Sequence, residues 1–441
     1  MIFSNKDLKR LIIPLIIEQI LMMLVGMADT IMISYAGEAA ISGVSLVDMI
    51  NNLIMYVLAA IATGGAVVVS QYLGNKDDDN ASLAAGQLIG ILVIFSTVTM
   101  ILCLVFHNAL LRLLFGSVEY DVMKAAVTYF IICLLSLPFL GLYNASAALY
   151  RSLGLTKVTM YVSLGVNLIN IVGNAIGIFV FDAGVAGVAI PTLLSRVFAG
   201  IMMFTLAFHQ DAIKLKWNDI KNYHSQMVKR ILKVALPNGI ENGLFHLGKV
   251  LVTSIVALFG TTHIAANGVA NSIDQIVPIV INAMNLAIIT VVGQCIGANE
   301  YEQAQYYIKK MMKISYIATF ILNVIVFLAL PLLLQLYDLS PQVSELTYIL
   351  VVIHNVLCFL LHPSSFLLSN ALRATGDVKV TMYAGIISML IFRLGSAYLF
   401  GIVLDLGVIG VWMAMGMDWL ARSIIFQVRY RSGQWMEYRV I

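Results

Sequence analysis

Charged residues are scarce in this sequence, and their scarcity limits what the chain can be. Asp, Glu, Lys and Arg together make up 11% of the 441 residues, whereas a soluble domain carries about 25%. Hydrophobic residues account for 61%, and the mean hydropathy is +0.93. Apolar stretches long enough to cross a hydrocarbon core of about 30 Å recur along the whole length. The composition therefore predicts a protein that crosses a membrane many times.

Several functional signals are also missing. The basic residues are spread over short loops and form no concentrated basic region, which argues against a nucleic-acid partner. The four cysteines lie singly in apolar segments and are expected to be small buried residues. No nucleophile–base pair, metal cluster or phosphate-binding glycine loop appears in a suitable context, so neither an enzyme nor a bound cofactor is predicted. The first apolar run, 11–34, is too long for the core of a cleaved signal peptide.

We predict an all-α membrane protein with twelve transmembrane helices. Helices are favoured over a barrel because the apolar runs are continuous and lack the alternation of barrel strands. The predicted spans are 11–34, 44–73, 83–106, 125–148, 158–181, 184–208, 232–258, 264–297, 307–336, 346–370, 380–403 and 406–428.

The loop charges predict the orientation. The N-terminus, the even-numbered loops and the C-terminal end hold 21 Lys and Arg residues, whereas the odd-numbered loops hold only Arg112 and Lys124. The 21 include Arg151, Arg373 and Arg422, which we assign to loops or span ends. By the positive-inside rule, both termini are cytoplasmic.

The chain repeats itself. "VSQYLGNKDDDNA" (69–81) matches "VGQCIGANEYEQA" (292–304) at a separation of 223 residues, and the same register pairs Pro14 with Pro237 and Glu18 with Glu241. "RSLGLTKVTMY" (151–161) matches "RATGDVKVTMY" (373–383) at 222. Parallel repeats of this kind are typical of transporters whose two halves move against each other. We therefore predict two six-helix bundles in a V, at 1–208 and 232–428, with a cytoplasmic linker at 209–231 and a cytoplasmic tail at 429–441. The linker is either an amphipathic surface helix around Trp217 or a solvated connection.

Polar residues mark the interior of the first half. Asp29 lies in an apolar span, where a carboxylate costs on the order of 3 kcal/mol and needs a partner or a water-filled cavity. Asn167, Asn170 and Asn174 lie on one face of the fifth span. They are either hydrogen-bonding contacts between helices or the lining of a hydrated pocket. With Asp29 they would offer oxygen atoms to a proton or Na⁺. Alternatively, Asp29 is simply solvated near the outer headgroups.

The second half carries different polar residues, and Val252 stands at the register of Asp29. Its charges either neutralise one another within the bundle or line a cavity. The charged residues are Glu241, Lys249, Arg393 and Asp418. With Asn167 and Tyr143 of the first half, the candidate cavity or substrate-binding residues are Asn242, His246, Lys249, Asn282, His362 and Arg393.

Over essentially its whole length the chain resembles the multidrug and toxic compound extrusion (MATE) transporters. The resemblance lies in "GMADTIMI" of the first span, in "VSQYLG" and "VGQCIG", and in "LYRSLGLTKVTM" with its partner "ALRATGDVKVTM". It implies that Asp29, Asn170 and Thr192 belong to a cation-coupling site and that the first helix bends at Pro14. Asn174 belongs to the same site but stands where many relatives have a second Asp.

The resemblance also implies a branch and a function. His246 and His362 occupy positions that are acidic in one branch, so the chain looks closer to the DNA-damage-inducible branch. The implied function is a secondary antiporter of the bacterial cytoplasmic membrane that exports cationic or amphipathic small molecules in exchange for H⁺ or Na⁺. It is expected to be a monomer. Membrane lipid is its surrounding partner. The alternative is a lipid-linked oligosaccharide flippase, for which only Lys249 and Arg393 are obvious cationic contacts.

Overall fold

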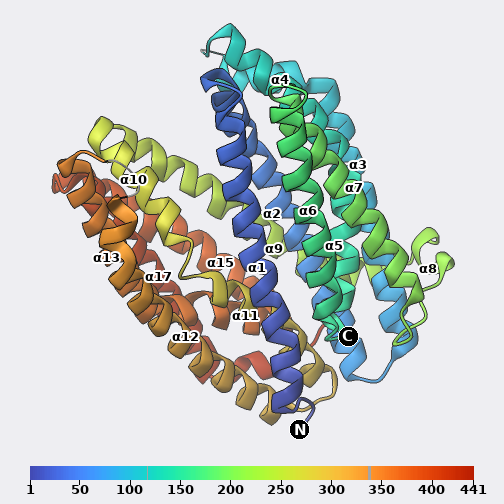
Figure 1. Ribbon diagram of the computed structural model, residues 1–441. Coiled ribbons are helices and arrows are strands. Elements are labelled where there is room, and N and C mark those ends of the chain that lie inside the picture. The colour runs from blue at the N-terminus through green and yellow to red at the C-terminus, as the bar shows by residue number, and fades with distance from the viewer. Residues whose placement is uncertain (117, 336–338) are drawn as a thin grey trace. The chain divides into compact units, whose positions relative to one another are not determined.

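A computed structural model describes residues 1–116, 118–335 and 339–441, and every regular element within them is helical (Figure 1). The chain divides into two compact units. The N-terminal unit comprises 3–239 with residue 441, and the C-terminal unit comprises 1–2 with 240–440. The boundary lies inside one helix, α9 (Ser225–Ala257). Residue 336, the last of one predicted span, lies outside the described residues.

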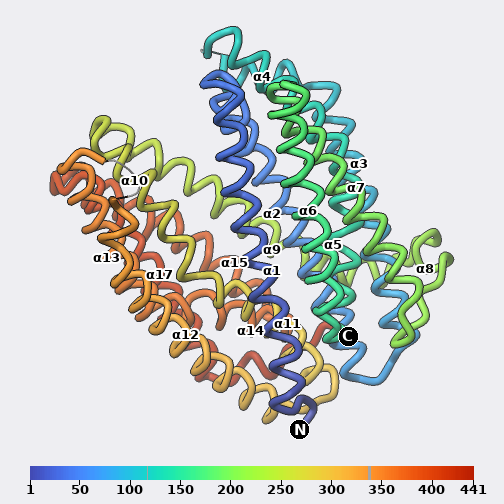
Figure 2. Tube along the Cα trace, in the orientation of Figure 1, coloured from blue at the N-terminus to red at the C-terminus, as the bar shows by residue number. Residues whose placement is uncertain are grey.

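The N-terminal unit is a bundle of long helices (Figure 2). Its elements are α1 (Asn5–Ser34), α2 (Glu38–Gly74), α3 (Asp78–Phe115), α4 (Tyr120–Leu135), α5 (Leu137–Ser152), α6 (Thr156–Phe179), α7 (Ala186–His209), the short α8 (Trp217–Lys221) and the start of α9. Helix α1 begins at a capping box between Ser4 and Asp7 and runs through Pro14 without a break. The helix α1 packs on α6, which packs on α7, and α5 packs between α3 and α7.

The apolar side chains of this unit face outward as well as inward. Along α3, the exposed residues include Ile94, Val98, Leu102, Val105 and Phe106. A water-facing helix would expose such a stripe only at a large cost, whereas hydrocarbon accepts it without penalty. The outward face of α3 is therefore a lipid-facing surface.

The C-terminal unit has less regular helices. After the rest of α9 come α10 (Thr261–Asp274), α11 (Ile279–Gly297), α12 (Tyr301–Gln335), α13 (Pro341–His362), α14 (Leu368–Thr375), α15 (Val378–Ile387), α16 (Ser396–Tyr398) and α17 (Gly407–Arg431). Three π-helical segments interrupt them, η1 (Pro363–Leu367), η2 (Ser388–Gly395) and η3 (Leu399–Val403), and a 3₁₀ turn, η4 (Gln434–Glu437), follows α17. Such π segments are rare and occur frequently at functional sites.

In the part of the chain that the structure describes, the predicted spans fall on helical segments, but the span predicted at 264–297 is wrong as one continuous helix, because it is broken between Asp274 and Ile279. Within the described residues, ten helices are long and apolar enough to cross a membrane, or eleven if α4 and α5, bent by 46°, form one span. Helix α9 is not in this set. The all-α, multi-span prediction is confirmed.

The linker contains a short helix that begins at Trp217, and the rest of it is held by contacts with the N-terminal unit. Its helix α8 has five residues, and the Trp217 ring packs against Phe204 and Phe208. Two side chains of α3 donate hydrogen bonds to the backbone of the linker on either side of α8. Ser82 Oγ donates to Lys214 O (2.7 Å), and Gln87 Nε2 donates to the carbonyl oxygen of Asn222 (2.8 Å). The linker is thereby fastened to the N-terminal unit.

Three of the arginines in our sequence-based count of loop charges are buried within helices. Arg151, Arg373 and Arg422 lie in helices α5, α14 and α17, and their side chains are only 16%, 6% and 3% exposed. Each pairs with a buried carboxylate of its own unit. Removing them leaves 18 basic residues of the original 21 against 2, so the charge bias keeps its direction.

Candidate functional site

A continuous chain of hydrogen bonds joins three helices of the N-terminal unit. Asn174 Nδ2 donates to Asp29 Oδ1 (2.6 Å) and to Asn170 Oδ1 (3.2 Å). Asn170 Nδ2 donates to Thr192 Oγ1 (3.2 Å), whose hydroxyl donates to Val188 O (2.9 Å). The structure thus brings together the four residues that the sequence analysis placed in a cation-coupling site.

Local structure explains why these side chains meet. Asn170 and Asn174 are one turn apart on α6, so both amides point along one face. That face lies between α1, which carries Asp29, and α7, which carries Thr192. The two amides are buried, whereas Asp29 is half-buried and remains accessible.

The cluster offers unused oxygen atoms. The buried Oδ1 of Asn174 has no hydrogen-bond donor among the described residues, and an unpaired buried acceptor is costly. The Asp29 carboxylate lies close to this oxygen, because it accepts a hydrogen bond from Nδ2 of the same Asn174 amide. Carboxylate, amide and hydroxyl oxygens are the ligands that hard cations prefer. The arrangement can therefore hold a proton or a small hard cation at Asp29.

Two further charged groups beside this site, Asp48 and Arg196, were not among the residues predicted from the sequence. Asp48 of α2 is hydrogen-bonded to Tyr129 of α4, and both Asp48 and Arg196 of α7 interact electrostatically with Asp29. Arg196 Nη1 donates to Ser136 Oγ (2.9 Å). The available signal was the presence of Asp48 and Arg196 within apolar spans.

Two other predicted residues of this unit lie apart from the hydrogen-bonded chain. The side-chain nitrogen of Asn167 is buried without a hydrogen-bond acceptor among the described residues. Tyr143 Oη donates to Glu18 Oε1 (3.4 Å), in a cluster where Arg151 Nη2 also donates to Oε1 (2.7 Å) and Thr159 Oγ1 donates to Oε2 (2.9 Å). Tyr143 therefore belongs to a buried ion-pair cluster between α1, α5 and α6.

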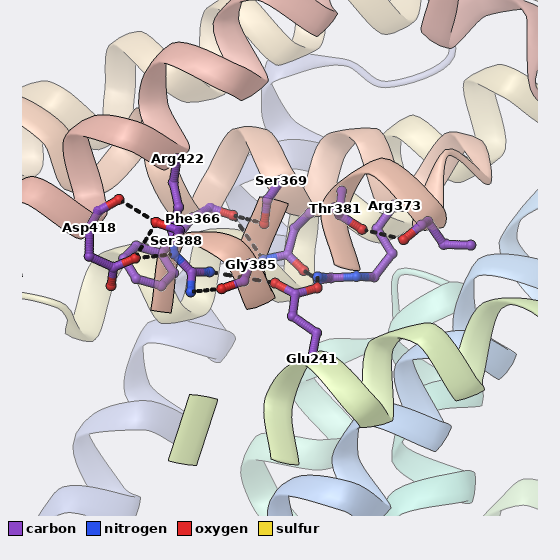
Figure 3. Close-up of polar contacts among 11 residues, drawn as sticks. Glu241, Phe366, Ser369, Arg373, Thr381, Gly385, Ser388, Asp418 and Arg422 are labelled. Carbon is purple, nitrogen blue, oxygen red and sulfur yellow. Dashed lines mark hydrogen bonds and ion pairs between the residues drawn. The ribbon is translucent and has the colours of Figure 1, made fainter. Parts of the chain in front are cut away.

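The C-terminal unit contains the counterpart of this ion pair (Figure 3). Arg373 Nη2 donates to Glu241 Oε2 at 2.7 Å, and Glu241 and Arg373 stand 223 and 222 residues after Glu18 and Arg151. Here the network extends further. Arg422 lies 3.6 Å from Glu241 Oε1 and donates through Nε to Asp418 Oδ1 (2.8 Å), which also accepts from Ser388.

Lys249 and Arg393 stand outside this network. Among the described residues neither forms a short ion pair with Glu241 or Asp418, although Asp418 interacts electrostatically with both cations. The positive partners are instead Arg373 and Arg422. Lys249 lies over the Phe245 ring, 5.5 Å from its centre, with its side chain exposed.

The remaining candidates of the C-terminal unit are spread over several elements. Asn242 and His246 share α9 with Lys249, and the His246 ring meets Phe245 edge-on. Asn282 is exposed near the start of α11, whereas His362 is buried at the end of α13. Arg393 lies in the π-helical segment η2.

A known family of proteins matches this chain twice, once in each half of the internal repeat. The family model MatE matches residues 14–176 and again 237–399. The chain is 29% identical over 435 residues to the uncharacterized transporter YisQ of Bacillus subtilis, covering 96% of this chain and 93% of that protein. It is 27% identical over 442 residues to the probable multidrug resistance protein NorM of Thermotoga maritima, covering 99% and 94%.

Solved structures share the fold. A MOP superfamily transporter from Pyrococcus furiosus superposes with a TM-score of 0.91 at 21% identity, over 98% of this chain and 96% of that one. A multidrug resistance MATE family transporter solved in an outward-facing conformation gives a TM-score of 0.90 at 21% identity, with the same coverage.

Proposed function

Because the chain belongs to the MATE family of transporters, we propose that it is a secondary antiporter that exports cationic or amphipathic small molecules in exchange for H⁺ or Na⁺. Multidrug export is supported by the similarity to NorM of Thermotoga maritima, a probable multidrug resistance protein. The observation that carries the coupling mechanism is the hydrogen-bonded chain from Asp29 through Asn174 and Asn170 to Thr192.

The coupling step is a change of charge at Asp29. While the carboxylate is ionised, it holds the amide group of Asn174 and thereby links α1 to α6. A bound proton or Na⁺ neutralises the carboxylate and weakens this charge-assisted hydrogen bond. The free Oδ1 of Asn174 then becomes available to the cation. Ion binding in this way replaces the direct hydrogen bond between Asp29 and Asn174 and so changes the packing of α1 against α6.

The motion follows from the position of Pro14. This residue lies 15 positions before Asp29, about 22 Å along the helix at 1.5 Å per residue. Proline removes one backbone hydrogen bond, so α1 bends there when its outer half is released. Bending of α1 changes the cavity of the N-terminal unit and expels the substrate. Each elementary charge that crosses 100 mV supplies about 2.3 kcal/mol for this cycle.

The setting of the protein follows from the same proposal. It lies in the bacterial cytoplasmic membrane, with both termini in the cytoplasm as the loop charges favour. It works as a monomer. Its partners are small-molecule substrates and the surrounding lipid.

Dye efflux from proteoliposomes tests the proposal. Wild-type protein is driven separately by a Na⁺ gradient and by a pH gradient, which identifies the coupling ion. Asp29→Asn should abolish ion-driven efflux while the protein still inserts and folds. Asp182→Asn is the matched control, because Asp182 is exposed outside the helices. Efflux at wild-type rates by the Asp29→Asn protein would sink the mechanism.

A further inference from the structure

One pair of equivalent positions in the two units, in the second helix of the repeat, holds different residues in different local structures. In the N-terminal unit this position is Asn51, inside the unbroken 37-residue helix α2. In the C-terminal unit it is Asp274, 223 residues later, where α10 ends. The chain then leaves the helix until α11 begins at Ile279. In transporters, ions bind where a membrane helix is interrupted and polar groups of the backbone and side chains become available.

A buried histidine meets the carboxylate at this interruption. His354 of α13 is 2% exposed, and its Nε2 lies 3.5 Å from Asp274 Oδ1. On the other side of the ring, Nδ1 lies 3.4 Å from Asn355 Oδ1. Both ring nitrogens therefore face oxygen atoms. A neutral imidazole carries only one N–H, whereas the protonated ring donates to both neighbours. One added proton on His354 would let both ring nitrogens donate hydrogen bonds, one to Asp274 and one to Asn355.

The surrounding charges favour a proton over a metal cation. Lys249 of α9 and Arg393 of η2 both interact electrostatically with Asp274. Asp418 of α17 acts on these two cations but is itself held by Arg422. Two further titratable neighbours among the described residues lie on α13: Cys358, on which Asp274 acts, and His362, on which His354 acts.

Asp274 is a single carboxylate that faces two cations, Lys249 and Arg393. Such a site is poor for Na⁺, because the ion would add a third positive charge next to one negative charge.

We propose that Asp274 and His354 form a second proton-binding site, located in the C-terminal unit and built on the break between α10 and α11. The bound proton lies on His354 Nε2 and is donated to Asp274 Oδ1, which draws the end of α10 against α13. The site is separate from Asp29, which lies in the other unit, and proton binding here does not depend on the antiport mechanism proposed above.

Two tryptophans provide a direct readout. The His354 ring lies edge-on to Trp412 and Trp419, with ring centres 6.1 and 5.6 Å apart. A protonated imidazole beside an indole quenches its fluorescence, whereas a neutral one does so weakly. The experiment is a titration of tryptophan fluorescence in the purified full-length protein from about pH 8 to about pH 5, the range in which histidine side chains ordinarily titrate.

The wild-type protein should show quenching as the pH falls. His354→Gln should lose this transition. In Asp274→Asn, half-quenching should need a roughly ten-fold or higher proton concentration, because a nearby carboxylate stabilises the protonated ring. His362→Gln is the matched control: the His362 ring also lies against Trp419, at 4.9 Å, but stacks on Phe366. It should keep the wild-type transition, as should Asp29→Asn.

The outcomes separate the possibilities. Absence of a transition in the wild-type protein, or its persistence in His354→Gln, overturns the proposal. Loss of the transition in His362→Gln overturns it in favour of the other histidine. If His354→Gln does not fold, Asp274→Asn decides alone, since an unchanged midpoint in that variant excludes the pair as the proton site. None of these readings depends on transport, so a failed efflux assay leaves them intact.

Discussion

In both units a glutamate on the first helix of the repeat holds an arginine from later in the same unit, and each shortest contact is 2.7 Å: Glu18 with Arg151, and Glu241 with Arg373. Away from these pairs the two interiors differ. The N-terminal unit has Asp29 with buried amides, whereas the C-terminal unit has Val252 at that register and a helix broken at Asp274. The repeated ion pair belongs to the scaffold, because both units keep it. The groups that differ are the candidates for ion and substrate binding.

The largest expected effect is on the repeated ion pair in the C-terminal unit. Glu241→Gln leaves two buried guanidinium groups, Arg373 and Arg422, without their shared carboxylate. Removing one partner of a buried ion pair costs about 3–5 kcal/mol, so thermal unfolding in detergent should occur at a clearly lower temperature. Glu38→Gln, at an exposed position, is the control. Equal stability of the two variants would show that the pair has no structural role.

The counterpart in the N-terminal unit should respond less. Glu18→Gln strands one arginine, Arg151, and the replacement amide can still accept from Thr159 or Tyr143. The loss should fall at the lower end of the same range, about 3 kcal/mol. The thermal unfolding temperatures of Glu18→Gln and Glu241→Gln, measured side by side, show which variant loses more stability. A larger loss for Glu18→Gln would reverse this interpretation of the two networks.

Transferring the carboxylate between units sharpens the contrast. Val252→Asp places an acid at the register of Asp29, but the positions equivalent to Asn170 and Asn174 are Phe392 and Ser396. Because Val252 is buried and no amide pair awaits the acid, the substitution should cost on the order of 3 kcal/mol. It should also fail to restore ion-driven efflux to the Asp29→Asn protein. Restored efflux would mean that the units are functionally interchangeable.

The smallest effects on stability are expected at the cation outside the networks. Lys249→Met should change the unfolding free energy by no more than about 0.5 kcal/mol, since surface-accessible side chains outside such networks contribute little. It should nevertheless alter which dyes are exported, because Lys249 is exposed within the C-terminal unit. Competition between cationic and anionic dyes in proteoliposomes measures this. Arg422→Met, which breaks the buried network, should instead reduce stability strongly.

Asn174→Asp tests the site in the opposite direction, by adding a carboxylate. The protein should fold, because the two side chains have the same shape. Two carboxylates attract Na⁺ more strongly than one, so efflux should become more dependent on Na⁺. Efflux measured against Na⁺ concentration, in wild type and variant, gives the comparison. Reduced Na⁺ dependence would count against Asn174 as a cation ligand.

Much of the fold and part of the site followed from local sequence patterns. The hydropathy of the spans predicted the helices, since lipid accepts only backbone that satisfies its own hydrogen bonds. Asn170 and Asn174 are one turn apart on a single helix, so their shared face could be derived from spacing alone. Asp29 was recognisable because a carboxylate in an apolar span requires a partner.

Only the tertiary structure decided which partners the charges have. Near the end of a span, a sequence pattern does not distinguish a cation in a loop from a buried one. Three such cations, Arg151, Arg373 and Arg422, pair with carboxylates because helices that are distant in the sequence pack together. The contact between Asp274 and His354 joins residues 80 positions apart and depends on a helix break that hydropathy does not reveal. Hydropathy and helical spacing are properties of neighbouring residues, and so the sequence determined the spans and their polar faces. Burial and pairing arise only when separate helices meet, and so they were determined by the packing of each unit.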